Sequence, residues 1–158
     1  MPAAFEGPPN ELAGLSMFLE EQRAAVLRKL DGLSEVQAIE HPTASEFCML
    51  TLVKHLAYVE RRWFQLEIAR RDVPGLWPPP DDSELELEPA DTIEKIRRLY
   101  EEIIDQDRDI LSVVTDLDSL SATGLNRRWV LLHLIEETAR HAGHADLIRE
   151  SIDGSKGP

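Results

Sequence analysis

The sequence predicts an all-α fold, a four-helix bundle in a single domain that spans residues 1–158. Apolar residues recur at helical spacing in four segments, and few stretches alternate in the manner of a β-strand. With 158 residues and 42% apolar side chains, the chain is long enough to bury one core. A bundle is the simplest architecture that buries four such helical faces.

The first helix is expected from about Asn10 to about Leu30. Asn10 is a suitable N-cap residue, and Asp31-Gly32 provides a stop signal after the helix. In the connection that follows, Pro42 disfavours helix. The inner face of the helix is marked by five apolar residues, Leu12, Leu15, Leu19, Val26 and Leu30.

The second helix is expected from about Ser45 to about Arg71, and prolines from position 74 onward terminate it. Its apolar stripe consists of Leu52, Leu56, Val59, Trp63 and Leu66. The single cysteine, Cys48, excludes an internal disulfide and is interpreted as a small buried hydrophobic residue.

A long acidic and proline-rich connection is expected over residues 72–90, between the second and third helices. Between Asp72 and Glu94 there are eight acidic residues and no lysine or arginine. Such a run of charge is typical of a solvated loop. It is also long enough to cross the end of a bundle.

The third helix is expected from about Asp91 to about Thr115, and the fourth from about Asn126 to about Ile152, with Gly154 closing the latter. The third helix carries a seam with isoleucines seven residues apart and one leucine between them, Ile96, Leu99, Ile103 and Ile110. This repeat is typical of a helix in a bundle.

The charge balance argues against a nucleic-acid partner. Thirty acidic and seventeen basic side chains give a net charge of −13, which repels phosphate backbones. The sequence contains no apolar run of membrane-spanning length, and its amino terminus lacks the features of a secretory signal. We therefore expect a cytoplasmic protein that binds neither nucleic acid nor membrane.

Four residues of the fourth helix are predicted to lie on successive turns of one face, namely His133, Glu137, His141 and His144. Imidazole and carboxylate together suit a divalent cation such as zinc or nickel. His55 lies within the inward stripe of the second helix and can supply a ligand from a facing helix.

The spacing along the fourth helix limits which residues can share an ion. His133 and His141 are two turns apart, about 12 Å along the axis, and cannot both reach an ion through bonds of about 2 Å. Periodicity alone does not choose among the remaining pairs, which are His133/Glu137, Glu137/His141 and His141/His144. The alternative interpretation of Glu137 is a salt bridge to Arg140, whereas Glu136 is expected to be a solvated charge.

A resemblance to a known superfamily is carried by residues 128–150, RWVLLHLIEETARHAGHADLIRE. This segment resembles the last helix of the DinB-like (YfiT-like) four-helix-bundle superfamily, and most of all the actinobacterial branch of mycothiol-dependent transferases. Two shorter stretches, over residues 30–34 and 52–64, agree in order and spacing with that superfamily.

The resemblance implies a metal site and a partner. In that superfamily a divalent metal is held by one histidine of the second helix and two ligands four residues apart on the fourth. The matching residues here are His55, Glu137 and His141, with zinc the first choice and nickel the second. The branch that resembles mycothiol-dependent maleylpyruvate isomerase has glutamate at the position that corresponds to Glu137. The resemblance also implies a homodimer.

Such a metal, with one coordination position open, would lower the pKa of a thiol bound at that position, so that the thiol ionises near neutral pH. We therefore expect a metal-dependent S-transferase, in which the metal-bound thiolate of a low-molecular-weight thiol such as mycothiol attacks an electrophile. Arg62 and His144 are further candidates for substrate binding, whereas Trp63 and Trp129 are expected to pack in the core or at a bundle end. Two alternatives remain open: a non-enzymatic, stress-related metal-binding bundle and a metal-dependent hydrolase.

Overall fold

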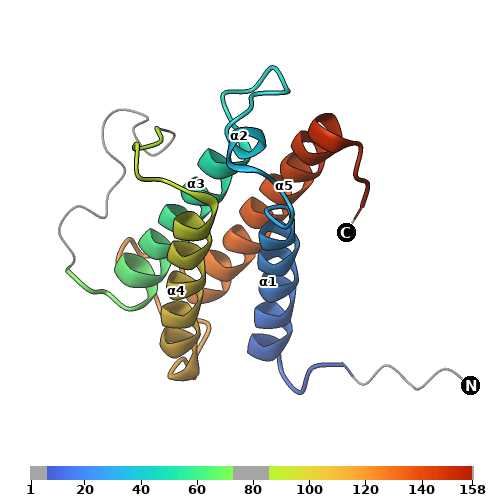
Figure 1. Ribbon diagram of the computed structural model, residues 1–158. Coiled ribbons are helices and arrows are strands. Elements are labelled where there is room, and N and C mark those ends of the chain that lie inside the picture. Colours follow the sequence, from blue (N-terminus) through green and yellow to red (C-terminus); the bar gives the residue numbers. More distant parts are fainter. Residues whose placement is uncertain (1–6, 73–85, 158) are drawn as a thin grey trace, which may run out of the picture.

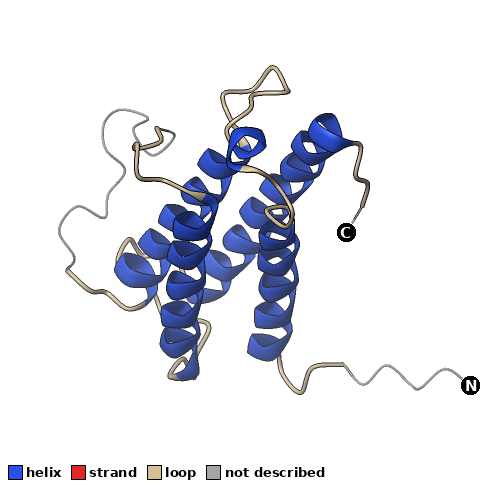
Figure 2. Ribbon diagram, in the orientation of Figure 1, coloured by secondary structure: helices blue, strands red, loops and turns tan. Residues whose placement is uncertain are grey.

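The all-α fold is confirmed by a computed structural model, which describes residues 7–72 and 86–157. The described part of the chain is helical and contains no strand (Figure 2). Most of the expected acidic connection lies outside the described residues. The four long helices are α1 (Glu11–Arg28), α3 (Met49–Arg62), α4 (Ile93–Ser112) and α5 (Arg127–Asp153), as labelled in Figure 1.

Side-chain caps fix the ends of three long helices close to where the sequence predicts them. The Oδ1 atom of Asn10 accepts a hydrogen bond from the backbone of Ala13 at 2.9 Å, and α1 begins at the next residue. Asn126 caps α5 in the same way, and Thr92 caps α4. Gly154 ends α5 with a φ of 75°, a left-handed conformation that glycine adopts without strain.

The second predicted helix needs two corrections. It begins at Met49 rather than near Ser45, because Cys48 has an extended backbone and acts as the N-cap, its Sγ accepting from the backbone of Thr51. Its last turns are not α-helical: residues Trp63–Ile68 form a π-helix, η1, that directly continues α3. A short helix, α2 (Glu35–Ala38), also lies in a connection for which no helix was predicted.

Helices α1 and α5 lie side by side and run parallel. Arg128, at the start of α5, forms an ion pair with Glu11, at the start of α1, at 2.6 Å. Lys29, directly after α1, forms one with Asp146, near the end of α5, at 2.5 Å. The two helices therefore stay in register over the length of α1 (Figure 1).

Helices α3 and α4 are also parallel to each other. Lys54, near the start of α3, pairs with Asp91, just before α4, at 2.8 Å. Further along both helices, Gln65 donates a hydrogen bond to Gln106 at 3.2 Å. Two parallel neighbours need a connection that returns to the end where the first one began, which accounts for the length of the segment between them.

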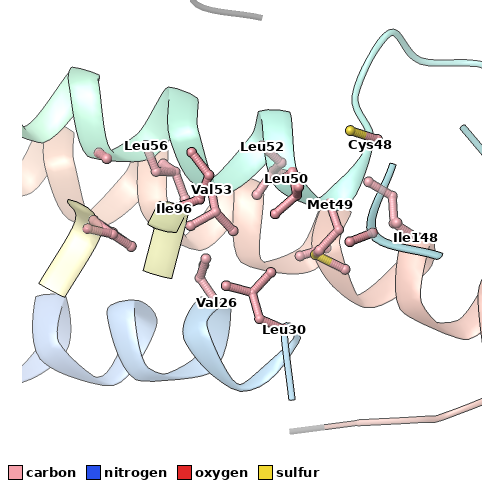
Figure 3. Packing of buried hydrophobic residues seen from close by; sticks show 14 of the residues in the cluster. Val26, Leu30, Cys48, Met49, Leu50, Leu52, Val53, Leu56, Ile96 and Ile148 are labelled. Atoms are coloured by element: carbon pink, nitrogen blue, oxygen red, sulfur yellow. The ribbon is translucent and has the colours of Figure 1, made fainter. Parts of the chain in front are cut away.

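The core consists of two clusters of buried apolar side chains. Figure 3 shows the larger one, in which residues of α3 such as Leu52 and Leu56 pack with Val26 of α1, Ile96 of α4 and Ile148 of α5. The second cluster fills the opposite part of the bundle, with Leu19, Phe64, Leu131 and Leu134 among its members. Cys48 is fully buried, in agreement with its interpretation as a small hydrophobic residue.

A buried network of charged and polar side chains lies between the two apolar clusters. The sequence analysis did not predict this network. The Arg23 guanidinium donates to Glu60 through Nε at 2.9 Å and Nη2 at 2.5 Å, and to Asp107 through Nη2 at 3.1 Å. Tyr100 donates its hydroxyl to the other oxygen of Glu60 at 2.5 Å. Arg23, Glu60, Asp107 and Tyr100 are all at most 1% exposed, so this network is part of the core.

Candidate metal centre

Helix α5 runs antiparallel to α3, and this orientation brings together the three expected ligands. His55 lies beside His141, with their ring centroids 5.0 Å apart, whereas Trp63 lies further along the chain beside Trp129. His55, Glu137 and His141 each offer one ligand atom, and these atoms all lie within 4.8 Å of one another. Sequence spacing had allowed three pairs on α5; Glu137 and His141 are the pair that meets His55.

The distances within this group match what a small divalent cation requires. Oε1 of Glu137 lies 3.1 Å from Nε2 of His141 and 3.5 Å from Nε2 of His55. Ligand atoms bound tetrahedrally to zinc, with bonds of about 2.1 Å, are separated from one another by about 3.4 Å. The residues present therefore fit a divalent cation with little rearrangement.

The electrostatics of the group favour the ionised form of Glu137. Hydrogen bonds from His141 and then from His55 hold the pKa of Glu137 well below its usual range, so this residue is a carboxylate at neutral pH. Nδ1 of His141 is buried and has no hydrogen-bond partner within residues 7–72 and 86–157. Its Nε2 is the ring nitrogen that faces the Glu137 carboxylate, at 3.1 Å.

The three side chains are accessible from solvent. They are 19%, 22% and 12% exposed for His55, Glu137 and His141, respectively. A structural metal site is normally closed by protein ligands on all sides, whereas a catalytic site keeps a position open. Three candidate ligands on a partly exposed surface match the arrangement that keeps one coordination position open.

Glu137 does not form the salt bridge that was its alternative interpretation. Arg140 instead pairs with the exposed Glu136 at 2.6 Å, as expected for a solvated charge at that position. The ring of His133 packs against two tryptophans that also contact each other. The carboxylate of Glu137 instead faces His55 and His141.

Phe47 closes one side of the group, and the sequence analysis did not identify it. Its ring centroid lies 5.6 Å from that of His55, 5.3 Å from that of His141 and 5.5 Å from that of His144. Phe47 directly precedes the N-cap of α3, where an apolar residue commonly fixes the angle at which the chain enters a helix. This position before the helix is the sequence signal from which the packing role of Phe47 could have been predicted.

His144 lies one turn beyond His141 and is held by a short chain of hydroxyl groups. Its Nε2 lies 2.9 Å from Oγ of Ser45, which lies 2.9 Å from Oγ1 of Thr43. Burial lowers the pKa of His144, so the neutral imidazole is favoured. Arg62, the other expected substrate-binding residue, is the last residue of α3 and is partly buried, two turns beyond His55.

A second group of rings lies on the other side of the candidate ligands. The His133 ring stacks on Trp129 with a centroid distance of 5.1 Å and an interplanar angle of 13°. Trp63 of η1 contacts His133 at 4.8 Å and Trp129 at 5.8 Å. Trp129 lies in the first turn of α5, packs on these two rings and remains 44% exposed.

Comparison with known proteins agrees with the resemblance carried by residues 128–150. The family model described as mycothiol-S-transferase matches residues 14–154 of the chain. Among solved structures, a crystal structure described as the conserved protein of a locus from Enterococcus faecalis is similar, with a TM-score of 0.67 and 14% sequence identity. That match covers 89% of this chain and 96% of the other, and it supports the fold alone.

No curated protein matches the chain. Within the described residues, none of the helices combines the length and the apolar character that crossing a membrane would require.

Proposed function

The chain belongs to the mycothiol-S-transferase family, and from this membership and the geometry of the site we propose that it is a metal-dependent S-transferase. The thiol is mycothiol or a similar low-molecular-weight thiol. The observation that carries the proposal is the convergence of two imidazoles and one carboxylate, from two helices, within 4.8 Å.

His55, Glu137 and His141 are the proposed metal ligands. Two neutral imidazoles and one carboxylate leave a dication with a net positive charge and suit zinc best, with nickel as the second choice. When bound, such a cation supplies a Lewis acid that lowers the pKa of a thiol at its open position. Glu137 is ionised at neutral pH, so its carboxylate is available to a cation.

The proposed reaction is a substitution at an electrophilic carbon. The thiol loses its proton to solvent, and the sulfur lone pair forms the new S–C bond. The bond from that carbon to the leaving group breaks, and the leaving group departs with the bonding electrons. No oxidant or reductant is needed.

The remaining side chains around the site position the reactants. Phe47 presents an apolar wall against both imidazoles and limits the access of water on that side. His144, fixed by Ser45, offers a hydrogen-bonding ring at the edge of the site. Arg62 is proposed to orient an anionic or polar group of a substrate, since it lies two turns from His55 on nearly the same face.

A thiol-transfer assay tests the proposal. Purified protein loaded with zinc is mixed with mycothiol and iodoacetamide, and the loss of free thiol is compared with a reaction without protein. We expect a rate above the uncatalysed one in the wild type and not in the His55→Ala variant. Bound metal without turnover would favour a non-enzymatic metal-binding bundle, and cleavage of an ester without added thiol would favour a hydrolase.

We also propose that the chain forms a single domain and a homodimer, and that it acts in the cytoplasm, where small thiols are kept reduced. Light scattering coupled to size-exclusion chromatography tests the homodimer, since the monomer has a mass of 17.9 kDa.

A further inference from the structure

Phe47 contacts both of the candidate histidine ligands, although these come from different helices. Its ring centroid lies 5.3 Å from that of His141 on α5 and 5.6 Å from that of His55 on α3. The two imidazoles are themselves 5.0 Å apart. The three rings therefore form one packed group, in which the ring of Phe47 opposes a rotation of either imidazole.

The short segment that carries Phe47 is tied to both of these helices. Oγ of Ser45 lies 2.9 Å from Nε2 of His144 on α5. At the other end, Cys48 is fully buried and caps α3, and its backbone N–H donates to Oγ1 of Thr51 at 3.0 Å. Phe47 lies between these two anchors and packs against the larger apolar cluster. Its ring is thus held in place relative to α3 and to α5 alike.

His141 lacks the contact that usually orients a ligand histidine. In metal sites, the ring nitrogen that does not bind the cation normally donates a hydrogen bond, and this bond fixes the orientation of the ring. Nδ1 of His141 is buried and has no hydrogen-bond partner in the part of the chain that the structure describes. Its Nε2 nevertheless faces the carboxylate of Glu137 at 3.1 Å. Ring packing, rather than a hydrogen bond at Nδ1, therefore accounts for this orientation.

The angles between the rings are those of specific aromatic contacts. Aromatic pairs prefer edge-to-face or offset arrangements with centroids about 4.5–7 Å apart, because the edge of one ring is attracted to the face of the other. The ring of Phe47 meets that of His141 at 72° and that of His144 at 90°. An aliphatic side chain of similar volume at this position would fill space without favouring one orientation of an imidazole.

We propose that Phe47 is a positioning residue of the metal centre, whose ring holds the imidazoles of His141 and His55 with their Nε2 atoms toward Glu137. This inference rests on the proposed metal site, and it goes beyond the apolar wall described above. A preorganised set of ligands binds more tightly, because less side-chain freedom is lost on binding. Removal of the ring is therefore expected to weaken metal binding, although Phe47 itself offers no ligand atom.

The test measures metal affinity without any turnover. The Kd for zinc is determined by competition with a chromophoric chelator for the wild type, Phe47→Leu and Phe47→Tyr. Phe47→Leu keeps an apolar side chain but removes the ring, and we expect it to raise the Kd about tenfold, as the loss of other groups that orient ligand histidines does. Phe47→Tyr keeps the ring and is expected to stay within about twofold of the wild type.

Phe64→Leu is the matched control, since it makes the same exchange in the other apolar cluster. Phe64 is fully buried, and the Arg23 guanidinium, not an imidazole, lies over its ring at 5.6 Å from the centroid. Its substitution is expected to lower the Tm and to leave the Kd for zinc within about twofold of the wild type. Equal increases in Kd for Phe47→Leu and Phe64→Leu would trace the effect to lost stability and would overturn the positioning role. Circular dichroism melting curves establish that all variants are folded.

The outcomes separate this inference from the proposed transferase. Zinc binding that weakens in Phe47→Leu, but neither in Phe47→Tyr nor in Phe64→Leu, supports the positioning role even if no thiol transfer is observed. Thiol transfer by the wild type, together with an unchanged zinc affinity of Phe47→Leu, would overturn the positioning role and leave the transferase function intact. A wild-type protein that binds no zinc would overturn both.

Discussion

Oε1 of Glu137 lies 3.5 Å from Nε2 of His55, and this contact joins α5 to α3, two antiparallel helices that are far apart in the sequence. Neither helix alone can bring a third ligand to the pair formed by Glu137 and His141. The candidate site therefore exists only when the bundle is packed, so binding of the proposed metal would be thermodynamically linked to folding stability.

The first prediction concerns the ligand set. His55→Ala removes the only proposed ligand on α3, and we expect the purified variant to lose its bound metal, as measured by elemental analysis. His133→Ala is the matched control, because this histidine shares the face of Glu137 but packs on tryptophans. A His55→Ala protein that retains as much metal as the wild type would contradict the triad.

The second prediction concerns metal removal. A cation bound only by the folded state at about 100 times its Kd stabilises that state by about 2.7 kcal/mol, which corresponds to roughly 5–10 °C in Tm for a chain of this size. We expect a chelator to lower the Tm of the wild type by this amount. Glu137→Gln keeps the side-chain volume and removes the charge, so the same chelator should leave its Tm nearly unchanged. An equal shift in both proteins would place the cation elsewhere.

Local signals in the sequence were sufficient to predict most of the fold. The apolar spacing of α1, α4 and α5 and their capping residues, Asn10 and Asn126, gave boundaries within a few residues of those observed. The candidate ligands could be narrowed to three pairs by helix geometry. The choice of Glu137 with His141 depended on where His55 lies, which is a tertiary contact that periodicity does not encode.

Three features could not be predicted for related reasons. The π-helix at Trp63 disrupts a pattern that had been interpreted with a single helical period. The stacking of His133 on Trp129 depends on the angle between α3 and α5. Arg23 and Glu60 are charged residue types, which are normally expected at the surface, and only their mutual pairing makes burial tolerable.

The third prediction concerns the buried charged network. Arg23→Leu leaves the carboxylate of Glu60 buried without its cation, and we expect a loss of about 3–5 kcal/mol in the free energy of unfolding. Arg108→Leu removes an arginine that also pairs with an acidic residue, Glu20, but is 55% exposed, and it should cost less than about 1 kcal/mol. Urea denaturation measures both values, and comparable losses in the two variants would argue against a special role of burial.

The fourth prediction concerns the pH dependence of stability and rests on Asp107. Burial, together with repulsion from Glu60, raises the pKa of Asp107 to about 9, and its Oδ1 has no hydrogen-bond partner among the described residues. Near neutral pH the folded protein therefore holds a proton on this carboxyl group, whereas the unfolded chain, with an ordinary pKa of about 4, does not.

Because the folded state binds more protons, the contribution of Asp107 to stability is fully present below about pH 4 and is lost as the pH rises toward 9, with a slope of up to about 1.4 kcal/mol per pH unit. Asp107→Asn replaces the protonated acid with a neutral amide of the same shape and removes this dependence. We expect the wild type to lose stability relative to Asp107→Asn between pH 5 and pH 8.5 in urea denaturation. Comparing the two proteins at each pH cancels the titration of the histidines, which both share, so a constant difference across this range would mean that Asp107 is already ionised in the folded protein.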